Sequence, residues 1–163
     1  MKVLFSKLED GFQTWSEENR YWLDKQTGVV VLIDSELSEF GLDSALFDNE
    51  EEREATRQIL VLNGKLKSDE LIDKDRFLSI EPPHSGDNWS WMEKFALNEV
   101  EDSEMQEKLV NAISNSKPFR RFRAILDNSE EHLQQWYAFR DICLREFIED
   151  WAKSEQIEID FDK

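Results

Sequence analysis

The feature that most restricts how this chain can fold is its shortage of glycine and proline. Only 5 glycines and 3 prolines occur in 163 residues. Tight turns depend on these residue types, because glycine adopts positive φ angles readily and proline presets φ near −65°. A β-sandwich, with a turn roughly every 8–12 residues, is therefore disfavoured. We expect a fold with few turns and many helices.

The apolar content predicts a chain that is folded throughout. Hydrophobic residues make up 39% of the sequence and aromatic residues 12%, including 6 tryptophans and 11 phenylalanines. So much apolar surface is atypical of a disordered chain, and the length matches one domain of common size. No repeat or low-complexity linker interrupts the pattern. We therefore predict a single domain spanning residues 1–163.

The order of the hydrophobic patterns predicts an α+β fold. It consists of a small antiparallel sheet, built from a hairpin and a third strand, with an N-terminal helix and a mostly helical C-terminal half. Apolar residues at helical spacing predict the first helix, β-favouring runs predict the strands, and Gly28 suits the hairpin turn. The expected elements of the sheet region are a helix over 3–16, strands over 21–23, 29–33 and 76–80, and an irregular segment over 35–48.

Helix start and stop signals divide the remaining sequence. Gly64 is placed to end a helix over 50–62, and a helix is expected after Asp87. Ser103 and Gln106 have the spacing of a capping box, and Pro118 suits the first turn of a further helix. Ser129 is expected to cap a final helix of about 20 to 25 residues, because two glutamates follow it in the first turn.

The charge and the apolar runs restrict the classes of partner. A formal net charge of −17 opposes general binding to nucleic acids and to anionic membranes. The longest apolar run, Val29–Ile33, is far shorter than a membrane span, and Val3–Phe5 is too short for a secretory signal. The lone cysteine, Cys143, lies in an apolar run and is typical of a reducing compartment. We expect a cytoplasmic protein.

Several segments along the chain resemble a known family. They begin with Tyr-Trp-Leu-Asp at 21–24, Thr27-Gly28 and Arg-Phe-Leu at 76–78, and continue with Ile80, Pro82-Pro83, Met92, Phe95, Phe-Arg-Arg-Phe at 119–122 and Trp-Tyr-Ala-Phe-Arg at 136–140. In their order and spacing they resemble the uncharacterised bacterial protein family 0158. The resemblance implies a small bacterial protein and no particular reaction.

The segment 117–123 is the strongest candidate binding site. It holds four cationic residues and two phenylalanines in an acidic chain. Arg120 and Arg121, between Phe119 and Phe122, could hold a phosphate or carboxylate while the aromatic rings stack on a ligand. Local salt bridges explain the cluster equally well, since Asp127 lies four residues after Arg123.

Arg140 is a second candidate, because all four of its helical neighbours at three and four positions are apolar. They are Trp136, Tyr137, Cys143 and Leu144. An arginine on a burying face needs a carboxylate or a bound anion, so we expect either a buried ion pair between the last two helices or a ligand contact that includes Trp136. Trp89 and Trp91 are two residues apart and point in different directions, so one of them is expected to be an exposed contact for a protein partner.

Catalytic signals are weak. The sequence has only two histidines and lacks a nucleophile elbow, a phosphate-binding glycine loop and paired-cysteine metal motifs. Glu81, His84 and Asp87 could touch a divalent ion, but their spacing is unspecific. We predict no catalytic residue, metal or cofactor, and interpret the chain as a non-enzymatic binding or regulatory protein that contacts another protein. The alternatives are a binder of a phosphate-bearing small ligand or nucleotide and, as a minor option, a metal-dependent hydrolase.

Overall fold

The computed structural model of the chain describes residues 1–34, 42–43 and 46–162. Contacts divide the chain into two compact units, one formed by 1–82 with 148–163 and the other by 83–147. The irregular segment expected over 35–48 lies for the most part outside the described residues. The α+β class is confirmed, with helices predominating in the C-terminal half. A single domain stays a prediction.

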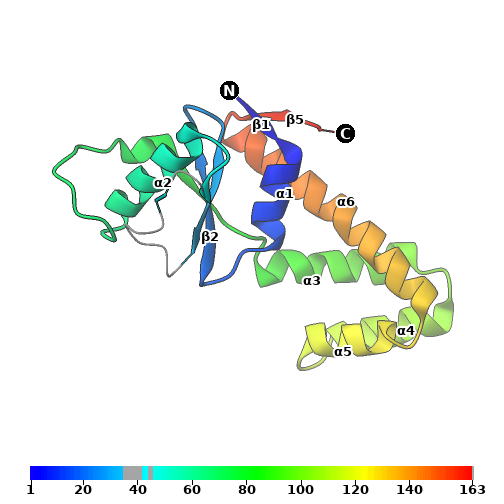
Figure 1. Cartoon of the computed structure of the whole chain (residues 1–163). Coiled ribbons are helices and arrows are strands. Elements are labelled where there is room, and N and C mark those ends of the chain that lie inside the picture. The colour runs from blue at the N-terminus through cyan, green and yellow to red at the C-terminus, as the bar shows by residue number, and fades with distance from the viewer. Residues whose placement is uncertain (35–41, 44–45, 163) are drawn as a thin grey trace. The chain divides into compact units, whose positions relative to one another are not determined.

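A three-stranded antiparallel sheet forms the centre of the first unit (Figure 1). Its middle strand, β2 (Asn19–Asp24), pairs with β3 (Val30–Asp34) on one side and with β4 (Phe77–Ile80) on the other. The predicted hairpin and third strand are therefore confirmed. The alternating burial along β3 agrees with strand geometry, in which successive side chains point to opposite faces.

Two helices pack on the sheet of this unit. Helix α1 (Phe5–Gln13) approaches so closely that a Cβ atom at Gly11 would lie 3.3 Å from the Cβ of Tyr21, which explains a glycine inside a helix. Helix α2 (Glu50–Leu62) contributes the buried residues Ala55, Ile59 and Leu60 to a core that it shares with β3 and Trp22. The predicted helix over 50–62 is confirmed with both boundaries, and Gly64 after it has φ = 71°.

The hairpin turn requires glycine for two reasons. Gly28 has φ = 81°, a conformation that residues with a side chain rarely adopt, as the sequence predicts. A Cβ atom at this position would also lie 2.6 Å from the carbonyl oxygen of Lys2. The turn therefore lies directly against the N-terminal strand of the same unit.

Asp24 is the one fully buried charged residue among the described residues, and it joins the hairpin turn to β4. Its carboxylate accepts two hydrogen bonds from Arg76, Nε to Oδ1 at 2.8 Å and Nη2 to Oδ2 at 2.6 Å. It also accepts from the backbone N–H of Gln26 and from the hydroxyl of Thr27, both at 2.9 Å. Burial raises the pKa of the Asp24 carboxyl, but these donors outweigh burial and hold the pKa below its usual value.

A second, two-stranded sheet joins the two ends of the described chain. Strand β1 (Lys2–Leu4) pairs in parallel with β5 (Glu158–Asp160). The carboxylate of Asp162 accepts hydrogen bonds from the backbone N–H of Ser6, at 3.1 Å, and from its hydroxyl, and so caps the first turn of α1. The predicted first helix was therefore wrong at its start, where residues 2–4 form a strand.

The second unit is helical. Its elements are α3 (Ser85–Lys94), the π-helical turn η4 (Phe95–Glu99), α4 (Ser103–Ile113), α5 (Pro118–Leu126) and α6 (Glu130–Ser154), of which residues up to 147 belong to this unit. Pro118 starts a helix as predicted. The capping box of Ser103 was wrong, because Asp102 is the cap residue and accepts a hydrogen bond from the N–H of Met105 at 2.9 Å.

The short 3-10 turn η3 (Lys74–Arg76) precedes β4 in the first unit. Among the described residues, no helix has the length and the apolar composition that crossing a membrane requires.

The Asp24–Arg76 pair provides a test of what stabilises the first unit. We expect Asp24→Ala to lower the free energy of unfolding by about 2 to 4 kcal/mol, because it removes one partner of a buried, hydrogen-bonded ion pair. Urea denaturation at pH 7 measures the loss. As a control, Glu50→Gln removes an exposed pair with Arg53 and should change stability by less than ~1 kcal/mol.

The same pair predicts a pH dependence. Because the folded-state pKa of Asp24 lies below its unfolded value, its stabilising contribution is complete above about pH 4 and decreases as the pH falls through the folded-state pKa. The stability difference between the wild type and Asp24→Ala should therefore shrink as the pH is lowered from 5 towards about 2. A difference that stays constant over this range would contradict the assignment.

Candidate functional site

The site is built on α5, whose orientation is determined by its apolar residues. Lys117 immediately before the helix has a left-handed backbone conformation (φ = 55°), and Pro118 opens the helix. Phe122 and Leu126, four positions apart, are buried on the same face. With about 100° of rotation per residue, Arg120 then points away from the core.

Phe122 and Trp136, both predicted to contact a ligand, lie in the core of the second unit. Their exposed fractions are 2% and 8%, and their ring centroids are 5.0 Å apart. Phe95 contacts both rings edge to face, at 6.3 and 5.4 Å. Such offset aromatic contacts add to the stabilisation from burial. These two residues therefore hold α5 and α6 together and present no free ring face for stacking.

Arg140 does not occupy the buried position that the sequence predicts. The side chain is exposed, and its guanidinium carbon lies 5.4 Å from the ring centre of Tyr137. No carboxylate lies within ion-pair distance of it in the part of the chain that the structure describes. The expected buried ion pair was wrong because a long arginine side chain can extend over a neighbouring ring to reach water.

Arg123 approaches the same tyrosine from α5. Its guanidinium carbon lies 5.3 Å from the ring centre of Tyr137, and its Nε donates to Oδ1 of Asp127 at 2.8 Å. The salt bridge proposed from the sequence is therefore confirmed for Arg123. The pKa of Arg123 is raised, first by the hydrogen bond to Asp127. The sequence could indicate only the contact between Tyr137 and Arg140, which are three positions apart on α6. Arg123 comes from α5, so its contact with Tyr137 depends on how the two helices pack.

The other cations of segment 117–123 have no such partner. Lys117, Arg120 and Arg121 are exposed and form no ion pair with any residue that the structure describes. Phe119, directly before Arg120 in the sequence, has 43% of its surface exposed. We call these four residues the cationic face of α5. Local salt bridges therefore account for Arg123 but leave three of the four cations in segment 117–123 unneutralised.

The charge distribution along the sequence makes this face distinctive. Between Lys108 and Leu126 there are five cationic residues and no acidic one, whereas the whole chain has a net charge of −17. A concentration of one sign of charge creates a local potential that attracts the opposite charge over a distance of about one Debye length, ~8 Å at physiological salt. The cationic face is therefore an attractive surface for acidic groups.

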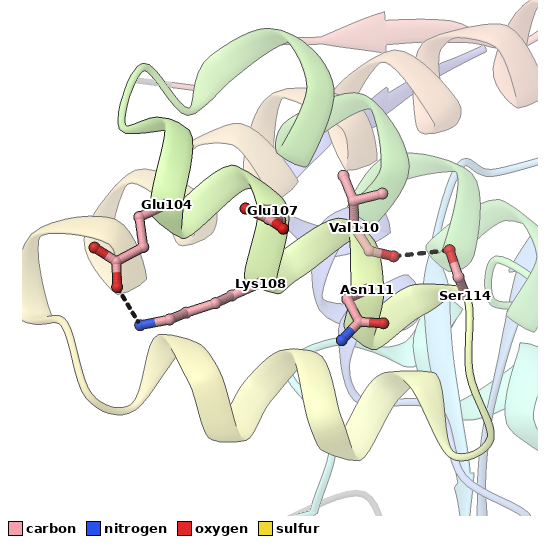
Figure 2. Close-up of a pocket in the computed structure, with 6 residues that line it drawn as sticks. All are labelled: Glu104, Glu107, Lys108, Val110, Asn111 and Ser114. Carbon is pink, nitrogen blue, oxygen red and sulfur yellow. Dashed lines mark hydrogen bonds and ion pairs between the residues drawn. The ribbon is translucent and has the colours of Figure 1, made fainter.

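A separate open groove of about 720 Å³ runs along α4 (Figure 2). All the residues that line it belong to α4 or its C-terminal cap: Glu104, Glu107, Lys108, Val110, Asn111 and Ser114. Its one cation, Lys108, is paired with Glu104 at 3.2 Å. With two glutamates and no free cation, the groove does not suit a phosphate-bearing ligand.

The remaining candidates have structural roles. Trp89 donates a hydrogen bond from Nε1 to the carbonyl of Ile113 at 3.1 Å, and Trp91 packs edge to face on Phe147. Both tryptophans are half-buried, so the expectation that one is exposed was wrong. Burial raises the pKa of the Cys143 thiol.

Glu81, His84 and Asp87, the loop residues considered as a possible metal site, do not form one cluster in the structure. Oδ2 of Asp87 accepts a hydrogen bond from the backbone N–H of His84 at 3.0 Å and so caps α3. Across the described ranges, no three histidine, cysteine or acidic side chains are grouped so that they could hold a metal ion. The other histidine, His132, contacts the hydroxyl of Ser129 through Nδ1 at 2.7 Å.

Together, the fold and the site define an acidic α+β protein that presents one cationic helix face. A model of the uncharacterised protein family UPF0158 matches residues 61–163. The chain is also 31% identical over 138 residues to UPF0158 protein PA5073 of Pseudomonas aeruginosa. The aligned residues make up 85% of this chain and 74% of the relative. The chain therefore belongs to this family, as the resemblance predicts. No solved structure matches it.

The two kinds of residue in segment 117–123 should respond differently to truncation. We expect Phe122→Ala to lower the free energy of unfolding by about 3 to 5 kcal/mol, because it leaves a cavity in the aromatic core. Arg120→Ala and Arg121→Ala should each change it by less than ~0.5 kcal/mol, since both side chains are exposed and unpaired. Thermal or urea unfolding of the three variants provides the comparison. A large loss for either arginine variant would show that the cationic face is a structural element.

Proposed function

We propose that the protein is a non-enzymatic binding or regulatory protein and that it contacts an acidic partner protein through the cationic face of α5. The observation that carries the proposal is the exposure of three unpaired cations, in the same segment as a half-exposed phenylalanine, in a strongly acidic chain. Unpaired arginines beside an exposed aromatic ring are typical of residues that contribute most of the binding energy at protein interfaces.

The shape of the surface favours a macromolecule over a small ligand. Small-molecule sites are concave and surround most of the ligand. The cationic face is instead the outer side of a helix. Of the three aromatic residues predicted to contact a ligand, Phe122 and Trp136 are in the core and Phe119 is exposed. A phosphate-bearing small ligand is therefore less well supported than a protein.

The charge favours a protein over a nucleic acid. Nucleic-acid binding depends on neutralising several phosphates, and the net charge of −17 opposes that over most of the surface. The four cations of segment 117–123 span only the start of one short helix and the residue before it. An acidic segment of another protein requires only local complementarity, and each arginine can hold one of its carboxylates with two hydrogen bonds.

We infer a cytoplasmic location as part of the same proposal. The lone cysteine, Cys143, is buried, and burial raises the pKa of its thiol, which lowers the fraction of reactive thiolate at neutral pH. A chain whose folding needs no disulfide suits a reducing compartment.

Charge reversal on α5 tests the proposal. We expect Arg120→Glu/Arg121→Glu to lose a partner that the wild-type protein retains in cross-linking and affinity capture from native lysate. The control, Lys67→Glu/Lys74→Glu, makes the same change in net charge at two exposed lysines of the first unit. It should retain the partner.

The comparison between variants, and not capture as such, decides the outcome. A protein captured by the wild type and the control but at least tenfold depleted in the α5 variant supports the proposal, since tenfold corresponds to about 1.4 kcal/mol. Equal capture by all three proteins would show that the cationic face takes no part in binding.

A further inference from the structure

We propose that the acidic partner segment lies across both α5 and α6, where it pairs with Arg120 and Arg140 together. This inference rests on the proposed function and adds a second helix to the binding surface. It also divides the cationic face of α5, because Arg120 lies on the side towards α6 and Arg121 on the other side. Tyr137 is the positioning residue that holds the guanidinium group of Arg140 at this surface.

One tyrosine ring connects the two helices. Arg123 of α5 and Arg140 of α6 each place a guanidinium carbon beside Tyr137, at 5.3 and 5.4 Å from the ring centre. Both distances lie within the range, up to about 6 Å, in which an aromatic ring attracts a cation. Because Tyr137 belongs to α6, the side of α5 that carries Arg123 is the side that borders α6.

Only one of these two cations is neutralised. Nε of Arg123 donates to Oδ1 of Asp127 at 2.8 Å, whereas Arg140 forms no ion pair within the ranges that the structure describes. The sequence of α6 explains the difference, because the neighbours of Arg140 at three and four positions include no acid: Trp136, Tyr137, Cys143 and Leu144. Arg140 is therefore an exposed positive charge without a local carboxylate.

Arg120 is the corresponding cation on α5. It lies three positions before Arg123, so the two side chains are neighbours, about 60° apart around the helix. None of the neighbours of Arg120 at three and four positions is acidic: Ser116, Lys117, Arg123 and Ala124. Two unneutralised cations, one from each helix, therefore lie on either side of the contact between Arg123 and Tyr137.

Arg121 differs from Arg120 in direction and not in charge or exposure. Both arginines are exposed and without an ion pair among the described residues. Arg121 lies two positions before Arg123, about 200° around the helix, and so points away from the side that borders α6. It is therefore a control within the same helix for any effect that depends on α6.

The ring contact prepares Arg140 for binding. An exposed arginine samples many rotamers, and an ion pair that restricts them loses conformational entropy. The contact with Tyr137 already restricts the guanidinium group of Arg140. A partner carboxylate then meets a cation that is partly ordered, and less entropy is lost when the pair forms.

The two-helix arrangement indicates the kind of acidic segment that fits. The axes of packed helices are about 8 to 10 Å apart, so cations on the two helices present charges at a similar separation. In an extended chain, which rises about 3.3 Å per residue, carboxylates about three residues apart have that spacing. The surface therefore suits a segment with several acidic residues better than a single carboxylate.

Titration with an oligoglutamate peptide of about ten residues, which can span both cations, tests the surface directly. At about 0.15 M salt, screening limits the repulsion by the net charge of the protein. We expect the Nε–H signals of Arg120 and Arg140 in NMR spectra to move together. Arg120→Glu and Arg140→Glu should each weaken peptide binding about threefold or more, whereas Arg121→Glu, with the same change in charge, should weaken it less than about twofold.

Two substitutions of Tyr137 test its positioning role without changing the net charge. Tyr137→Phe keeps the ring and should bind the peptide as the wild type does. Tyr137→Leu removes the ring, so it should weaken binding about twofold or more and shift the Nε–H signal of Arg140 before peptide is added. Circular dichroism confirms that each variant keeps its fold, and the Arg140→Glu titration tests the surface if Tyr137→Leu does not fold.

The outcomes separate this inference from the proposed function. A wild type that does not bind the peptide, or binding that depends on Arg121 as much as on Arg120 and not on Arg140, overturns the two-helix surface. Unchanged binding by a folded Tyr137→Leu variant overturns the positioning role. The capture experiment then decides the proposed function by itself: it stands if Arg120→Glu/Arg121→Glu loses a partner and falls if capture is unchanged.

Discussion

The first unit depends on one buried carboxylate. Asp24 accepts hydrogen bonds from Gln26 and Thr27 of the hairpin turn and from Nε and Nη2 of Arg76, directly before β4. These donors lie in the turn after β2 and directly before β4, so one carboxylate links the hairpin turn to the start of β4. The segments that carry the family resemblance include both Asp24 and Arg76. Their joint presence has a physical reason, because either charge would be left without its partner if the other were lost.

In the second unit, aromatic packing decides which charges reach solvent. The rings of Phe95, Phe122 and Trp136 fix the rotation of α5 about its axis. That rotation turns Arg120 and Arg121 outward and brings Arg123 against Tyr137. The cationic face is therefore a consequence of core packing, and the binding proposals for α5 depend on that core as much as on the arginines themselves.

Local signals predicted most of the elements. The hairpin, β4, α2 and the start of α5 follow from Gly28, Gly64, Pro118 and the apolar periodicity, each of which acts within a few residues. The β1–β5 pair could not be predicted, because its strands are three residues each and lie more than 150 residues apart. Apolar neighbours suggested burial of Arg140, but its long side chain extends over Tyr137 into solvent.

The sequence by itself determined the α+β class, the acidic character and the location of the cationic segment, because composition and periodicity act without reference to distant residues. Only the tertiary structure decided that Phe122 is core and that Arg120 and Arg121 are exposed and unpaired. Pairing and exposure depend on which side chains meet in space, and the spacing of residues along one helix or strand does not contain that information.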